Sequence, residues 1–105
     1  MHTLLKVTMT DVQTANTALT SGEFQKILKQ VTDLIKPESS FFYSEQGCRA
    51  ALFIFNMRDV SMIPQIAEPL FIGLNAKVEF IPAMDASELT KGLQVIQKEA
   101  PSNLS

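Results

Sequence analysis

The sequence has few of the residues that common catalytic and metal sites require. Among its 105 residues there is no tryptophan, one cysteine (Cys48) and one histidine (His2). A single thiol excludes an internal disulfide and a cysteine-rich zinc site, and one terminal histidine cannot by itself build a metal site or a catalytic triad. The chain also lacks the GxGxxG, P-loop, HExxH and GxSxG motifs. We therefore expect neither a metal nor a cofactor.

Charge and long apolar runs are also scarce. Nine basic and eleven acidic residues are scattered singly and give a net charge of −2, which provides no basic patch for nucleic acid or anionic lipid. No apolar run approaches the roughly 18 to 20 residues that span a bilayer, and the N-terminus does not resemble a signal peptide. We expect a cytoplasmic protein with one domain over residues 1–105, in which 100–105 form a flexible tail.

What the sequence does contain is a clear succession of apolar patterns. They predict strand, helix, strand, strand, helix, strand and a terminal helix. The predicted strands are 3–9, 39–45, 48–57 and 76–84, and the predicted helices begin at Thr20, Ser61 and Asp85, whereas 11–19 is a short helical turn or a loop. Capping boxes are predicted at Thr20 with Glu23 and at Asp85 with Glu88. Ser61 is expected to cap the second helix, which we expect to kink or break at the interior Pro69 and to end at Gly73 and Asn75. Leu89, Leu93 and Ile96 of the terminal helix are expected to point inward.

This order of elements predicts an α+β fold. Two interleaved right-handed βαβ units form a ferredoxin-like plait, with βαββαβ topology and here an added C-terminal helix. The expected sheet has four antiparallel strands in the order 4-1-3-2, and both main helices cover one face.

The third strand predicts a second copy of the chain. Residues 50–55 are apolar on both faces, yet the helices cover only one. A symmetric homodimer that packs sheet against sheet would remove the other face from water. Lys6 and Glu79 are expected to pair across neighbouring strands within that interface.

Three segments carry a resemblance that covers nearly the whole chain. They are GCRAALFIFNM (47–57), IPQIAEPLFIGLNAKVEFIPAM (63–84) and DASELTKGL (85–93). The chain resembles an uncharacterised family of small bacterial proteins in the dimeric α/β-barrel superfamily. The resemblance implies the ferredoxin-like fold and dimerisation. The wider superfamily includes cofactor-free quinone-forming monooxygenases, lactone isomerases, haem enzymes and ligand sensors, and this chain has no catalytic signature of any of them.

Four residues are candidates for a site. Glu68 precedes the helix-interior proline and is either a partly buried carboxylate that acts as a base or ligand anchor, or a solvated outer residue or partner of Arg49. Tyr43 and Arg49 flank the hairpin turn and either bind an acidic or aromatic ligand or form a simple hairpin rim. Asn56 is either a buried polar ligand group or a strand-end cap.

Three functions remain open on this basis. The leading hypothesis is a homodimer that binds a small apolar or aromatic molecule between sheet and helices, near Glu68. The second is a structural or regulatory dimer without a ligand. The third is a cofactor-free monooxygenase-like or isomerase-like enzyme with Glu68 as its base.

Overall fold

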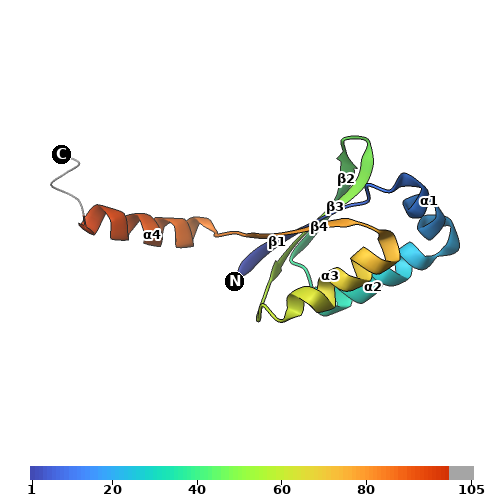
Figure 1. Cartoon of the computed structure of the whole chain (residues 1–105). Helices are drawn as coiled ribbons and strands as arrows, with labels where there is room; N and C mark the ends of the chain where they lie inside the picture. The colour runs from blue at the N-terminus through green and yellow to red at the C-terminus, as the bar shows by residue number, and fades with distance from the viewer. Residues whose placement is uncertain (100–105) are drawn as a thin grey trace.

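The computed structural model describes residues 1–99 and has an α+β architecture, with four strands in one antiparallel sheet and four helices in that part of the chain (Figure 1). The elements are β1 (His2–Thr8), α1 (Val12–Ser21), α2 (Glu23–Ile35), β2 (Ser39–Glu45), β3 (Cys48–Asn56), α3 (Met62–Leu74), β4 (Lys77–Pro82) and α4 (Ala86–Glu99). The predicted tail, 100–105, lies outside the described residues.

The sheet has the strand order β2-β3-β1-β4. Read from the opposite edge, this is 4-1-3-2, and the arrangement is compatible with a ferredoxin-like plait. β1 and β3 are the two central strands, and β1 pairs with β3 along its whole length, from His2 opposite Asn56 to Thr8 opposite Ala50. The β2–β3 hairpin closes at Gln46 and Gly47, which both have positive φ as a two-residue type I′ turn requires.

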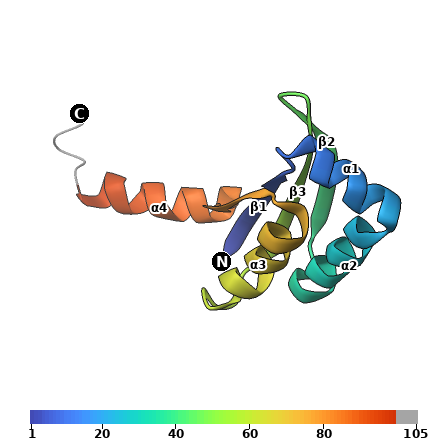
Figure 2. The ribbon, with the colours of Figure 1, turned by 45° about the vertical axis from the view of Figure 1, so that its right-hand side comes forward.

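One face of the sheet carries the core. Because side chains alternate along a strand, Leu5 lies opposite Phe53 on one side and Phe80 on the other, and all three point toward the helices. Helices α2 and α3 lie side by side over this face (Figure 2). The fully buried large side chains include Leu5, Val31, Phe53, Phe55, Ile66 and Leu74.

Where the sequence predicts a short helical turn or a loop, the structure has the ten-residue helix α1. Asp11 caps it, since the Asp11 carboxylate accepts a hydrogen bond from the Thr14 N–H at 3.0 Å. The capping box predicted at Thr20 is wrong: the Thr20 hydroxyl bonds back to the Asn16 carbonyl inside α1. Gly22, at φ +87°, joins α1 to α2 in a left-handed conformation that glycine adopts at little cost.

Two predictions about α3 also need correction. Ser61 makes no side-chain cap, and the Asp59 carboxylate instead accepts the Ser61 N–H at 2.8 Å. Of the kink or break expected at Pro69, the break is wrong, because the helix runs without interruption from Met62 to Leu74, and the kink stays a prediction. Proline removes the hydrogen bond to the Gln65 carbonyl, but Gln65 is on an exposed side of α3, where water can satisfy that carbonyl.

Gly73 is a packing residue and not the helix end that the sequence suggested. Asn75 ends α3 in a left-handed conformation (φ 49°), and its N–H bonds back to the Phe71 carbonyl. A Cβ added to Gly73 would overlap the Cδ1 atom of Ile27 in α2. The missing side chain therefore lets α2 and α3 approach closely.

Helix α4 projects away from the sheet (Figures 1 and 2). Its capping box is confirmed: the Glu88 N–H donates to Asp85 at 2.8 Å, and the Asp85 N–H donates to Glu88 at 3.1 Å. The expectation that Leu89, Leu93 and Ile96 point inward is wrong, because they are 47%, 48% and 57% exposed. The radius of gyration is 17.9 Å, whereas about 13 Å is typical of a compact chain of this length.

Candidate functional site

The most distinctive surface is the sheet face that points away from α2 and α3, here called the open face. The register places Leu4, Ile54 and Ile81 in one row across three strands and Phe41 and Leu52 in the next row. We call the apolar band the set Leu4, Phe41, Tyr43, Leu52, Ile54 and Ile81. Phe41 is 54% exposed, Tyr43 and Ile81 are each 38% exposed, and the other three are half-buried. The band thus crosses all four strands.

Beside the band lies a polar hollow of about 600 Å³, here called the polar corner. It is lined by Lys6, Thr8, Thr10, Glu45, Gln46, Cys48, Lys77 and Glu79. Positively charged, negatively charged and uncharged polar side chains, together with a free thiol, therefore surround one cavity at the end of the open face.

An ion pair holds the polar corner together. Lys6 Nζ lies 2.8 Å from Glu45 Oε2, and the two side chains are 25% and 33% exposed. Because Lys6 is on β1 and Glu45 on β2, the pair bridges β3, where the small, buried side chain of Ala50 leaves room for it. The hydrogen bond to Glu45, followed by the charges of Glu45, Tyr43 and Glu79, holds the pKa of Lys6 above its usual value.

Lys6 and Glu79, which were predicted to pair with each other, each have a different salt-bridge partner. The two residues are opposite each other in the register, but the salt bridge of Lys6 is with Glu45. Glu79 instead lies 3.8 Å from Lys77. Sequence reasoning identified the neighbouring strands but could not find Glu45, because its pairing needs a long side chain that crosses an intervening strand.

Tyr43 and Arg49 line one hollow of about 350 Å³ at the hairpin end of the sheet. Arg49 Nη1 donates a hydrogen bond to Asn16 Oδ1 at 2.7 Å, which ties β3 to α1. The structure thus brings together two residues that the sequence paired as a ligand site. Their role in binding remains a prediction.

Glu68 is exposed on α3, as in the solvated alternative. The cavity between sheet and helices is apolar, measures about 20 Å³ and does not include Glu68 in its lining. Known ligand pockets measure roughly 300 to 1,000 Å³, so this space has room for about one water-sized molecule. Asn56 is exposed at the end of β3, where its side-chain oxygen accepts a hydrogen bond from the Met1 amino group at 2.6 Å.

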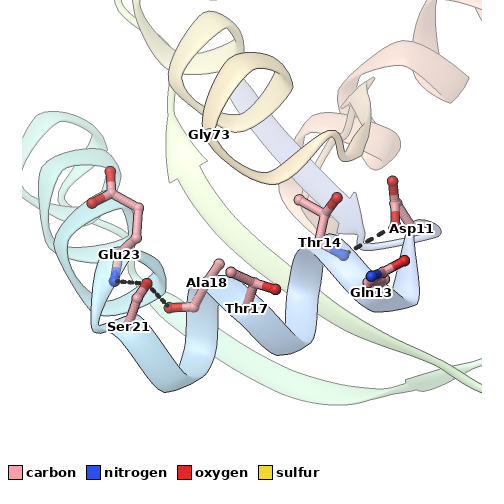
Figure 3. A pocket seen from close by; sticks show the side chains of 8 residues that line it. All are labelled: Asp11, Gln13, Thr14, Thr17, Ala18, Ser21, Glu23 and Gly73. Carbon is pink, nitrogen blue, oxygen red and sulfur yellow. Dashed lines mark hydrogen bonds between the residues drawn. The ribbon is translucent and has the colours of Figure 1, made fainter.

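A third hollow, of about 400 Å³, lies along α1 and the start of α2 (Figure 3). Its polar groups serve the helix ends: Asp11 caps α1 and also accepts a hydrogen bond from the Asn75 side chain at 3.1 Å, and Ser21 accepts the Glu23 N–H at 3.3 Å. The Thr14 N–H, followed by the Asn75 amide, keeps the pKa of Asp11 below its usual value. These bonds identify a helix-capping region.

His2, Asp85 and Glu88 form a cluster that the sequence did not reveal, because more than 80 positions separate His2 from the acids. Their ligand atoms lie within 4.8 Å of one another, and His2 Nδ1 is 3.1 Å from Glu88 Oε1. Both carboxylates already accept the backbone N–H groups of the α4 capping box. The cluster thus anchors the start of α4 to β1.

Comparison of the chain with protein-family models, curated proteins and solved structures found no match. Within residues 1–99, no helix is both long enough and apolar enough to cross a membrane.

Proposed function

We propose that the chain functions as a small homodimeric binding protein, in which a second copy covers the open face and closes the polar corner into a site for a small polar molecule. The observation that carries this proposal is the open face itself. It combines an apolar band that no helix of residues 1–99 covers with the partly buried Lys6–Glu45 ion pair, beside a cavity of about 600 Å³.

The energetics of the apolar band support a second copy. Burial of apolar surface stabilises by about 25 cal/mol per Å², so a band of several hundred Å² contributes on the order of several kcal/mol when it is covered. A self-associating chain supplies such a cover through a two-fold symmetric interface. The dimeric α/β barrel implied by the sequence resemblance is one form of this dimer, in which the two open faces pack directly together.

The residues of the polar corner favour a ligand that both donates and accepts hydrogen bonds. Lys6 and Lys77 supply positive charge, Glu45 and Glu79 supply negative charge, and Thr8 adds a hydroxyl. Coverage by a second copy would exclude water from this cavity and strengthen its hydrogen bonds and ion pairs. A small zwitterion or hydroxylated molecule matches this lining better than an apolar one.

The ligand is tested by thermal unfolding of the full chain against a panel of small zwitterions and hydroxylated molecules, together with native mass spectrometry of the purified protein. We expect at least one compound to raise the unfolding temperature, and Lys6→Met to abolish that shift. The matched control is Lys29→Met, which removes a lysine that is also ion-paired, at 2.7 Å to Asp33, but lies on α2. A shift that survives Lys6→Met would place the ligand elsewhere, and no shift with any compound would favour a structural dimer without a ligand.

A further inference from the structure

Helix α4 carries an apolar stripe that has no partner within residues 1–99. With 100° between successive residues, Leu89, Leu93 and Ile96 fall within about 60° of one another around the helix. All three are about half exposed, and α4 contributes no residue to the described core. A 14-residue amphipathic helix is marginally stable by itself in water, because most helical stability comes from packing of the apolar face.

The direction of α4 separates its stripe from the open face of its own sheet. Only residues 83–85 connect β4 to α4, and the Asp85–Glu88 capping box and the His2–Glu88 contact hold the first turn in place. From there the helix axis leads away from the sheet (Figures 1 and 2), and the molecule is 62 Å long but only 28 by 19 Å across. To reach its own apolar band, α4 would have to give up the contact that anchors it.

The dimensions of α4 match those of the apolar band. At 1.5 Å per residue, 14 helical residues span about 21 Å. Four strands at about 4.8 Å spacing are roughly 15 to 19 Å wide, and the band extends from Ile81 on β4 to Phe41 on β2. One α4 helix is therefore long enough to cross all four strands. Its apolar stripe, from Leu89 to Ile96, spans about 10 Å, which is roughly the width of two strands.

From these three observations we infer that α4 of each copy lies across the apolar band of the other copy. This inference rests on the proposed dimer and specifies how its interface is built. The exchange is reciprocal: in a two-fold symmetric dimer each α4 stripe covers the band of the other copy. Both stripes and both bands are then buried, and no surface is left to bind a third copy. Direct packing of the two open faces would fill both bands, so α4 cannot occupy the band in that arrangement.

The test is light scattering of full-length variants over a range of concentrations. Leu93→Asp places a charge in the stripe, and we expect it to weaken dimerisation by at least about tenfold, because a carboxylate must then be buried against the band. The matched control, Gln94→Asp, places the same carboxylate at least 100° away from all three stripe residues and should leave the dimer unchanged. Circular dichroism checks that α4 remains helical in both variants. Ile54→Asp, in the band, should weaken the dimer whichever way the second copy covers it.

The outcomes separate this inference from the dimer itself. A wild-type chain that is monomeric at all concentrations would overturn the proposed dimer. A dimer that Ile54→Asp weakens and Leu93→Asp leaves intact would overturn the α4 exchange but retain the dimer. Loss of the dimer with Leu93→Asp and not with Gln94→Asp supports the exchange.

A cross-linking experiment locates the contact. A photo-reactive amino acid replaces Leu93, and unlabelled and ¹⁵N-labelled copies are mixed and allowed to exchange before irradiation. We expect peptides of the apolar band to become attached to α4, with mixed isotope labels that prove contact between copies. Attachment only between peptides of the same label, or attachment to the outer side of α3, would contradict the inference.

Discussion

The two faces of the sheet differ in how the chain covers them, although residues 50–55 of β3 are apolar on both. Phe53 points toward α2 and α3 and is 2% exposed, whereas its neighbour Leu52 points to the open face and is half-buried. Both side chains have the hydrophobicity of core residues. The difference shows that the described chain supplies helices for one face only, and it is the reason that a second copy is proposed for the other.

The largest predicted effect is on the covered face. Phe53→Ala removes a fully buried ring that packs edge-on against Phe42, at 6.0 Å between ring centres. We expect it to lower the free energy of unfolding by about 3 to 5 kcal/mol, as is typical when a large buried side chain is truncated. Urea unfolding checks this. A loss below about 1 kcal/mol would mean that the core beneath the helices is not tightly packed.

On the open face, Leu52→Ala is expected to lower the free energy of unfolding by less, about 1 to 2 kcal/mol, because Leu52 is only half-buried by its own chain. The two variants should differ in concentration dependence: the loss of unfolding free energy should grow with protein concentration for Leu52→Ala and stay constant for Phe53→Ala, since only Leu52 lies where the second copy is proposed to bind. Urea unfolding at several protein concentrations measures both. If the effects of both variants depended on protein concentration in the same way, the proposal that a second copy covers only the open face would be contradicted.

The close contact of the helices that cover the sheet is tested by Gly73→Ala. The added Cβ would overlap Ile27, which is 4% exposed and has little room to move, so we expect a net loss of about 1 kcal/mol despite the better helix propensity of alanine. Gly92→Ala is the matched control. Its added Cβ would meet nothing within 4 Å, and it should stabilise α4. If both substitutions stabilise the protein, then α2 and α3 are not held as closely as described.

The smallest expected effect concerns the ion pair of the open face. Since its bond to Glu45 raises the pKa of Lys6 in the folded state above 10.5, the stabilisation is complete below about pH 10.5 and is lost as the pH rises through the higher, folded-state pKa. The unfolding temperature of Lys6→Met, measured from about pH 8 to pH 11.5, should therefore approach that of the wild type at the alkaline end.

The control for this effect is Lys29→Met. Its pair with Asp33 also raises the lysine pKa, but the two side chains are 76% and 66% exposed, so solvent screens the pair more strongly than that of Lys6 and Glu45. We expect a weaker pH dependence for Lys29→Met. A stronger one would show that the open face gives its ion pair no protection from solvent.

Much of the fold could be predicted from the sequence, because the strongest local signals agree with the tertiary structure. The β2 bounds and the start of β3 follow from their aromatic and apolar runs and the intervening turn, and the apolar stripe of α2 places Ile27, Val31 and Ile35 in the core. The first helix was predicted only as a short helical turn or a loop, because only Ala15 and Ala18 are buried in it and its apolar pattern is weak.

The predictions that were wrong concerned features that depend on contacts between distant parts of the chain and not on the local sequence pattern. The stripe of α4 was recognised, but its expected inward direction assumed a partner in the same chain. A kink or break at Pro69 was expected from backbone chemistry, but the helix continues, because the carbonyl that loses its hydrogen bond is on the exposed side of α3. The sequence indicated Glu68 as the candidate site, whereas the structure favours the polar corner. The Lys6–Glu45 ion pair could not be predicted, because the two residues are far apart in the sequence and meet only in the folded sheet.

The measurement that most directly tests whether a second copy covers the open face is the mass of the full chain in solution. Size-exclusion chromatography with multi-angle light scattering at micromolar concentrations should give twice the 11.6 kDa mass of one chain. Dilution should shift that mass toward one chain. A mass of 11.6 kDa at every concentration up to the millimolar range would contradict the central claim.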